Sequence, residues 1–188
     1  ICNGQSTNLS ASGASTYNWD NGLGSGSSHT VSPSADITYT VTGTDASGCT
    51  ASANVSVTVN PGSVAPTGAT ASPSDICTGA SSTLSVVGGS LEPGASWEWY
   101  SGSCGGTAEG SGNSISVSPS TTTNYYVRGE GTCNTTACAT VSVNVKTEST
   151  APTSATASIN PVCPGISTTL SYSGGSLGTG ATAEWYSG

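Results

Sequence analysis

Seven cysteines are the residues of this 188-residue sequence whose number and spacing point most directly to chemistry. Only one histidine accompanies them and no Cys-x-x-Cys pair occurs, which argues against zinc and dithiol redox sites. Cysteine-rich extracellular chains form disulfides in oxidising compartments. The disulfide candidates are Cys2, Cys49, Cys77, Cys104, Cys133 and Cys138, and Cys163 should lack a partner within these residues.

Other chemistries have weaker support. His29 would need an orienting carboxylate and an oxyanion hole to serve a hydrolase, and we expect it to be an exposed strand residue. The loops Asp20-Asn21-Gly22 and Asp45–Gly48 carry oxygen ligands, but neither gathers the several carboxylates of a calcium loop. Asx-turns account for both loops without a metal. We therefore predict no catalytic residues, no metal site and no cofactor.

Aromatic side chains offer a third chemistry, the stacking of sugar rings. Strand alternation puts Trp97 and Trp99 on one face and Tyr100 on the other. We expect Trp99 to be a core residue, because Trp19 and Trp185 stand at corresponding places. Tyr100 and Tyr186 are the candidates for exposed aromatic contacts.

The elements that position these residues come in copies with a period of 86 residues. Ala65–Ser72 returns with one change at 151–158, and Trp99–Gly102 returns at 185–188. The pattern Tyr125-x-Val127-x-Gly129 has an earlier counterpart beginning at Tyr39. Such a period indicates an array of small domains. We assign copy one to residues 1–61, lacking its N-terminal strand, copy two to the complete 62–147, and copy three to 148–188, with first strands only.

Within each copy the apolar residues alternate with polar ones, and no helical period of useful length occurs. Short strands with turn signals every eight to twelve residues predict an all-β chain of tandem immunoglobulin-like β-sandwiches. Leu84, Trp97 and Val127 fall where such a sandwich places its central residues. Tyr125 suits a tyrosine corner.

Composition limits the partners. Charged residues make up 6% of the chain, and the net charge is −8 because ten acids face only Arg128 and Lys146. A surface this poor in cations cannot follow a phosphate backbone, so nucleic acid is excluded. No apolar run approaches the length of a membrane span.

The disulfide pairing stays open at this stage. Equal numbers of early and late cysteines favour pairing within each copy, Cys2 with Cys49, and Cys77 and Cys104 with Cys133 and Cys138. The direction of the strands argues against this pairing. Cys77 lies about 23 Å before the strand centre at Leu84 if the chain is extended, whereas the Cα atoms of two disulfide-bonded cysteines lie roughly 4.4–6.8 Å apart. The alternatives are an early cysteine bonded to a late one of the next copy, or Cys77 with Cys104 and Cys133 with Cys138. We favour pairing within each copy.

A family resemblance rests on four stretches of copy two: Ile76-Cys77-x-Gly79, Trp99–Gly106, Tyr125–Arg128 and Gly131–Cys133. They resemble the Ig-like repeats of very large secreted surface proteins of Bacteroidota. Copy one, with Ile1-Cys2-x-Gly4, Tyr39–Asp45 and Gly48-Cys49, looks like the related PKD-like and gliding-adhesin repeats. This resemblance implies an extracellular, cell-surface location and a role in adhesion or gliding.

We therefore expect a non-enzymatic stalk or filament segment of a bacterial surface adhesin. Its partners would be neighbouring copies of the same chain and a surface ligand. Sandwiches of identical period on short proline-containing linkers provide length and stiffness. One alternative is a carbohydrate-binding accessory module of a secreted enzyme, with polysaccharide bound at Tyr100 or Tyr186. Another is a self-assembling filament in which identical chains contact laterally.

Overall fold

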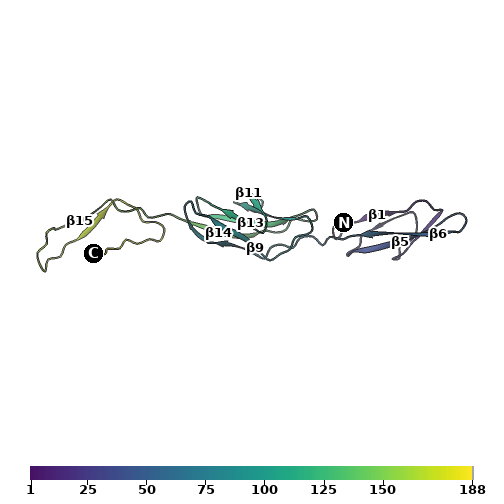
Figure 1. Cartoon of the computed structure of the whole chain (residues 1–188), viewed down its shortest axis with the longest axis horizontal. Coiled ribbons are helices and arrows are strands. Elements are labelled where there is room, and N and C mark those ends of the chain that lie inside the picture. The colour runs from purple at the N-terminus through teal and green to yellow at the C-terminus, as the bar shows by residue number, and fades with distance from the viewer. Residues whose placement is uncertain (188) are drawn as a thin grey trace. The chain divides into compact units, whose positions relative to one another are not determined.

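The computed structural model describes residues 1–187, and all their regular structure is β-strand (Figure 1). The alternation of polar and apolar residues explains why. In β13 (Thr123–Glu130), Tyr125, Val127 and Gly129 are buried on one face while their neighbours are partly exposed. Since successive strand residues point to opposite faces, this pattern lets a strand cover a core on one side only. The predicted all-β fold of Ig-like sandwiches is confirmed.

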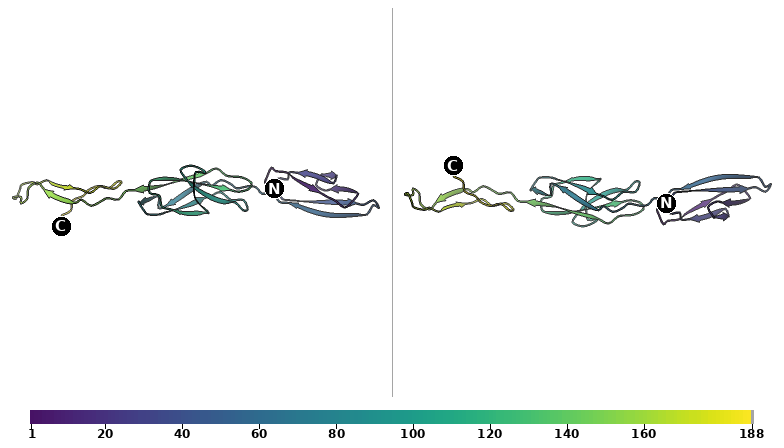
Figure 2. Two further views of the ribbon diagram at one scale, coloured as in Figure 1. Left: turned by 90° about the horizontal axis from the view of Figure 1, so that it is seen from above. Right: turned by 90° about the horizontal axis from the view of Figure 1, so that it is seen from below.

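Copy one contains two sheets. Its strands are β1 (Thr7–Ser10), β2 (Thr16–Trp19), β3 (Gly24–Ser25), β4 (Ser28–Val31), β5 (Ile37–Thr44) and β6 (Thr50–Val57). One sheet pairs β1 with β4, and the other has the order β3-β2-β5-β6. The long β5–β6 hairpin, in blue, is seen from two sides in Figure 2. The core consists of Leu9, Trp19, Val31, Tyr39, Val41 and Val57.

Copy two also forms two sheets. Besides β13, its strands are β7 (Gly68–Ser72), β8 (Asp75–Cys77), β9 (Ser82–Val87), β10 (Ser96–Ser101), β11 (Thr107–Ser111), β12 (Ser114–Val117) and β14 (Ala139–Lys146). The sheet orders are β12-β9-β7 and β11-β10-β13-β14-β8. Leu84, Trp97 and Val127 are all buried, as predicted for central residues.

The short strand β8 pairs in parallel with β14, the last strand of copy two. Its register places Ile76 opposite Val145 and Cys77 opposite Lys146. Copy one has a shorter version of the same arrangement, a parallel bridge between Cys2 and Asn60. Copies one and two thus each hold an early cysteine beside the end of the last strand.

Copy three has two strands, β15 (Ser154–Ala157) and β16 (Leu170–Ser173), paired antiparallel. They correspond to β7 and β9, and the register is the same: Ala71 faces Leu84, and Ala157 faces Leu170. Residues 148–187 contain no counterparts of β12, β13 and β14.

The contacts between residues divide the described chain into two compact units. The first consists of Ile1–Thr67, Gly88–Glu98 and Arg128–Cys138, and the second of Gly68–Val87, Trp99–Val127 and Ala139 onward. The first unit therefore holds copy one together with the parts of copy two that meet it. The second unit holds copy three.

Candidate functional site: the junction of copies one and two

A disulfide between Cys2 and Cys133 connects copy one to copy two, across 131 residues of sequence, with the two Cα atoms 5.4 Å apart. On the side of copy one, Cys2 is held by main-chain hydrogen bonds of its neighbours. Asn60 N donates to Ile1 O at 2.8 Å, and Asn3 N donates to Asn60 O at 2.9 Å. The first residues of the chain are thus fixed beside the start of the linker to copy two.

On the side of copy two, Cys133 lies in the loop between β13 and β14. The Glu92 carboxylate is buried, and its Oε1 accepts a hydrogen bond from Cys133 N at 2.8 Å. Gly131 passes so close to this carboxylate that a side chain there would collide with it. Glu92 therefore sets the position of the loop that presents Cys133.

The linker between the copies is held at Ser63, whose three polar groups are all engaged. Its N donates to Asn134 Oδ1 at 2.7 Å, and its O accepts from Asn134 Nδ2 at 2.9 Å. Its hydroxyl oxygen accepts from Glu92 N at 3.0 Å. The next residue, Val64, exchanges two main-chain hydrogen bonds with Ser90. Hydrogen bonds this complete restrict rotation of the linker.

The observed pairing corrects our expectation for copy one, where a Cys2–Cys49 bond is wrong. Cys49 precedes the first residue of β6, whereas Cys2 lies beside Asn60, beyond the end of β6. Cys49 and Asn60 are eleven positions apart in sequence, and an extended chain of that length spans about 36 Å, far more than a disulfide can bridge. The alternative of an early cysteine bonded to the next copy is the one observed.

Copy two contains the second disulfide. Cys104 and Cys138 are both disulfide-bonded. They are bonded to each other, because Cys49, Cys77 and Cys163 are free and exposed. This bond lies within one copy, as expected, but the expectation that Cys77 would pair within copy two is wrong.

The aromatic candidates divide into core and surface. Trp99 is fully buried, and its indole N donates to Gly112 O at 3.0 Å. Trp19 makes the matching bond to Gly26 O, also at 3.0 Å, so both are core residues, as predicted for Trp99. Tyr100 is half-buried, whereas Tyr186 is 84% exposed. A hydrogen bond from the Tyr186 hydroxyl to Glu184 raises the pKa of that phenol.

His29 is half-buried rather than exposed, which corrects another expectation. Its ring packs edge-on against Trp19, with centroids 6.1 Å apart, and its Nε2 is buried without a hydrogen-bond partner among the described residues. Val31, two residues further along β4, is buried, so strand alternation puts His29 on the same core-facing side.

The two acidic loops use their carboxylates for the backbone. Asp45 Oδ1 accepts from Ser47 N at 2.8 Å and from Cys49 N at 2.9 Å, which is an Asx-turn. Asp20 Oδ1 accepts from Thr40 N at 2.9 Å. Within residues 1–187 no three His, Cys, Asp or Glu side chains are grouped as metal ligands.

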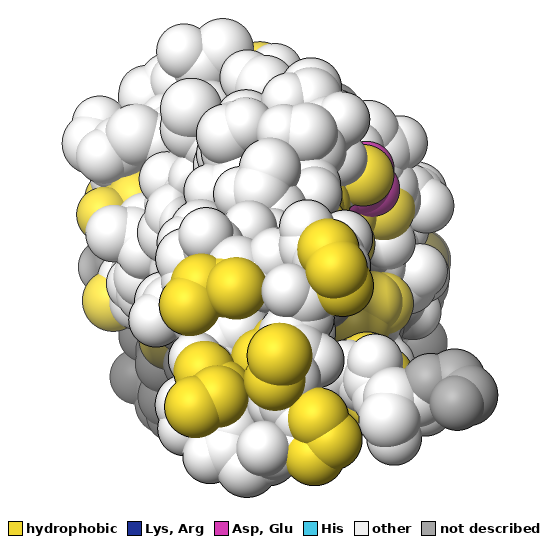
Figure 3. Space-filling view, turned by 90° about the vertical axis from the view of Figure 1, so that its left-hand side faces the viewer, with side chains coloured by type: hydrophobic (Ala, Val, Ile, Leu, Met, Phe, Trp, Pro, Cys, Tyr) yellow, Lys and Arg dark blue, Asp and Glu magenta, His cyan; other side chains and the backbone are white. Residues whose placement is uncertain are grey.

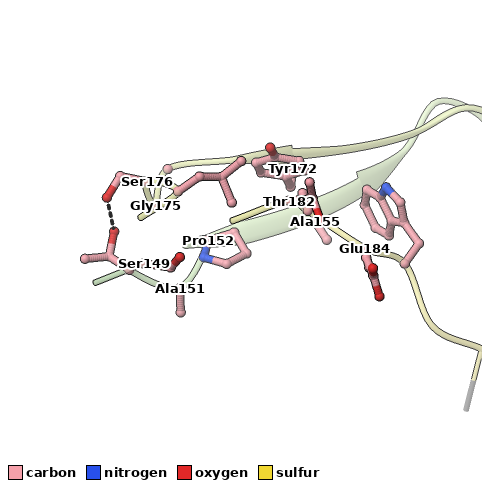
Figure 4. A pocket seen from close by; sticks show the side chains of 14 residues that line it. Ser149, Ala151, Pro152, Ala155, Tyr172, Gly175, Ser176, Thr182 and Glu184 are labelled. Carbon is pink, nitrogen blue, oxygen red and sulfur yellow. Dashed lines mark hydrogen bonds between the residues drawn. The ribbon is translucent and has the colours of Figure 1, made fainter. Parts of the chain in front are cut away.

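Copy three has an open groove on the inner face of its hairpin (Figure 4). Tyr172 and Trp185 lie across it with ring centroids 6.2 Å apart. Ser176 lies within a Gly-x-Ser-x-Gly sequence at 174–178. Its hydroxyl and its main chain both form hydrogen bonds with Thr150. The groove is the uncovered core face of this copy. On the face drawn in Figure 3, hydrophobic side chains gather in the lower half and little charge is visible among the described residues.

Sequence reasoning did not find Glu92, Asn134 and Ser63. A signal existed for Ser63, because the same residue type returns 86 positions later at Ser149. Glu92 gave no signal, since an acid between Leu91 and Pro93 in a loop is usually exposed.

Residues 64–146 match the family described as Ig-like domain, CHU_C associated. Among solved structures, murine CEACAM1b is similar at 13% identity and a TM-score of 0.44, covering 78% of this chain and 94% of that one. The fibronectin(III)-like modules of Clostridium thermocellum CbhA are similar at 12% identity and a TM-score of 0.41, covering 78% and 88%. No curated protein matches the chain.

Residues 64–146 are thus similar to an Ig-like domain. Together with two disulfides, which persist in oxidising compartments, the match indicates an extracytoplasmic protein. No helix among residues 1–187 is long and apolar enough to cross a membrane.

Proposed function

We propose that this chain is a structural segment of an extracellular bacterial surface protein, a stalk or filament that holds an adhesive element away from the cell. The observation that carries the proposal is the Cys2–Cys133 disulfide between consecutive Ig-like copies. A polypeptide linker alone permits two domains to hinge. A second covalent connection beside the linker opposes that hinging, and stiffness is what a stalk needs.

The linker residues support the same function. Ser63 and Asn134 hold the connection through two hydrogen bonds at 2.7 and 2.9 Å. Few charges and many serine and threonine side chains make the surface hydrated and passive. Neighbouring copies of the same chain are then the principal partners.

Small-angle X-ray scattering of the full chain tests the proposal, comparing the unmodified protein with the double variant Cys2→Ser, Cys133→Ser. We expect the variant to keep its far-UV circular dichroism but to show a broader pair-distance distribution, because the copies hinge. An unchanged distribution would remove the stiffening role. Imaging of the native parent protein as isolated compact particles, rather than extended fibres, would contradict the stalk itself.

A carbohydrate-binding accessory module is the second candidate, and the exposed ring of Tyr186 is the observation in its favour. Binding to immobilised polysaccharides distinguishes the two functions. The accessory module requires binding that Tyr186→Ala abolishes and Tyr126→Ala leaves intact, whereas the stalk requires none. Lateral association of identical chains would appear in the same images as bundled fibres.

A further inference from the structure

The junction that connects copies one and two is repeated, in part, between copies two and three. Ser149 Oγ accepts a hydrogen bond from Gly178 N at 2.8 Å, just as Ser63 Oγ accepts from Glu92 N at 3.0 Å. Thr150 exchanges main-chain hydrogen bonds with Ser176 at 2.9 and 3.3 Å. Val64 and Ser90 make the same pair of bonds at 2.8 and 3.2 Å. Each residue of the second junction lies 86 positions after its counterpart.

Cys77 occupies in the second junction the place that Cys2 occupies in the first. Cys77 is paired in parallel with Lys146, three residues before Ser149. Cys2 is paired in parallel with Asn60, three residues before Ser63. The difference is that Cys2 is bonded, whereas Cys77 is free and exposed. In the first junction the bonding partner comes from the loop between β13 and β14, and residues 148–187 contain no such loop.

We propose that Cys77 is a docking site for the corresponding loop of a following Ig-like copy, and that a disulfide equivalent to Cys2–Cys133 closes the second junction. The partner is a cysteine at the place of Cys133, which a period of 86 residues puts at position 219 of a continued chain. Two thiols lose two protons and two electrons as the S–S bond forms. A disulfide oxidant takes them up and is reduced to two thiols.

Copy one contains a loop that corresponds to the one carrying Cys133 in the first junction. Cys49 lies in the loop between β5 and β6, which corresponds to the loop that carries Cys133. In both loops a carboxylate oxygen accepts a hydrogen bond from the cysteine N, Asp45 to Cys49 at 2.9 Å and Glu92 to Cys133 at 2.8 Å. Both thiols are thus presented on loops ordered by an acid. Cys49 is the thiol that a preceding copy would engage.

The test extends the full chain by a second 103–147 segment placed after Gly188. Gly188 corresponds to Gly102, so the addition continues the repeat in register and completes copy three. After oxidation in a glutathione buffer, a non-reducing peptide map should show Cys77 joined to the added counterpart of Cys133. Maleimide should label Cys77 in the 188-residue chain and fail to label it in the extended chain.

Two variants of the extended chain make the result specific. Cys77→Ser should release exactly one added thiol, the counterpart of Cys133, while Cys163→Ser should leave the map unchanged. Labelling of Cys77 in extended chains that contain an intact Cys2–Cys133 bond would overturn the proposal, and that bond also reports correct folding.

The inference rests on the proposed stalk, because it concerns junctions between consecutive copies. Different results would contradict the second disulfide and the stalk. If Cys77 stays free while native particles are extended, the stalk stands and the second disulfide does not. If the bond forms but native particles are compact, the junction stands and the stalk does not.

Discussion

Copies two and three contain nearly the same hairpin and differ in what covers it. Leu84 of copy two is 0% exposed, whereas its counterpart Leu170 in copy three is 50% exposed. Trp99 and Trp185 differ in the same way, at 0% and 50%. The strand register is identical in the two hairpins.

The difference separates the pairing of strands, which depends on local sequence, from the burial of their side chains, which depends on a covering sheet. Pairing of β7 with β9, and of β15 with β16, is encoded locally, because it recurs with and without a covering sheet. Burial depends on β13 and β14, which bring Tyr125, Val127 and Val143 over the hairpin of copy two. Burial also raises the pKa of the Tyr125 phenol, to which the charge of Glu109 adds.

The largest expected effect separates the two tryptophans. Trp99→Ala should destabilise copy two by about 3–5 kcal/mol, because it empties a packed core and removes a hydrogen bond. Trp185→Ala should change stability by less than about 0.5 kcal/mol, as exposed sites usually do. Urea unfolding followed by far-UV circular dichroism measures both. Equal losses would mean that copy three has a covered core in solution.

The next effect compares the bonded cysteine with its free counterpart. Cys2→Ser should lower the free energy of unfolding by about 2–4 kcal/mol, since the lost bond closes a long loop. Cys77→Ser is the matched control and should have no effect in this chain. Thermal unfolding with and without reductant provides the measurement, and reductant should abolish the difference between Cys2→Ser and the unmodified protein.

The two junction serines give a smaller contrast. Ser63→Ala should cost about 1 kcal/mol, because it leaves the buried Glu92 N without an acceptor. Ser149→Ala should cost less, since Ser149 is exposed and water replaces its hydroxyl. Hydrogen exchange at the amides of Glu92 and Gly178 reports each site directly. A faster exchange at Gly178 than at Glu92 in the unmodified protein would agree with this order.

The smallest effect concerns β8, which holds Cys77. Hydrogen bonds from Asn144 and Lys146, and the charge of Lys146, lower the pKa of Asp75 below its ordinary 3.8. Because the folded pKa is the lower one, this stabilisation is present above 3.8 and is lost as the pH falls through the folded value. Hydrogen exchange of β8 amides should accelerate in that acid range. Asp75→Asn should remove the pH dependence, and its persistence would assign it to another group.

The sequence by itself determined the all-β fold, the 86-residue repeat and the core role of Trp99, because alternation and spacing are local properties of the chain. It left the cysteine pairing open between rival schemes, and the scheme we favoured was wrong for Cys2. Bonding between Cys2 and Cys133 depends on which ends of two sandwiches meet, and counting cysteines does not reveal that. The edge-on contact of His29 with Trp19 likewise joins strands of two different sheets. Tertiary structure decided these points, since each depends on strand direction and on contacts between residues far apart in sequence.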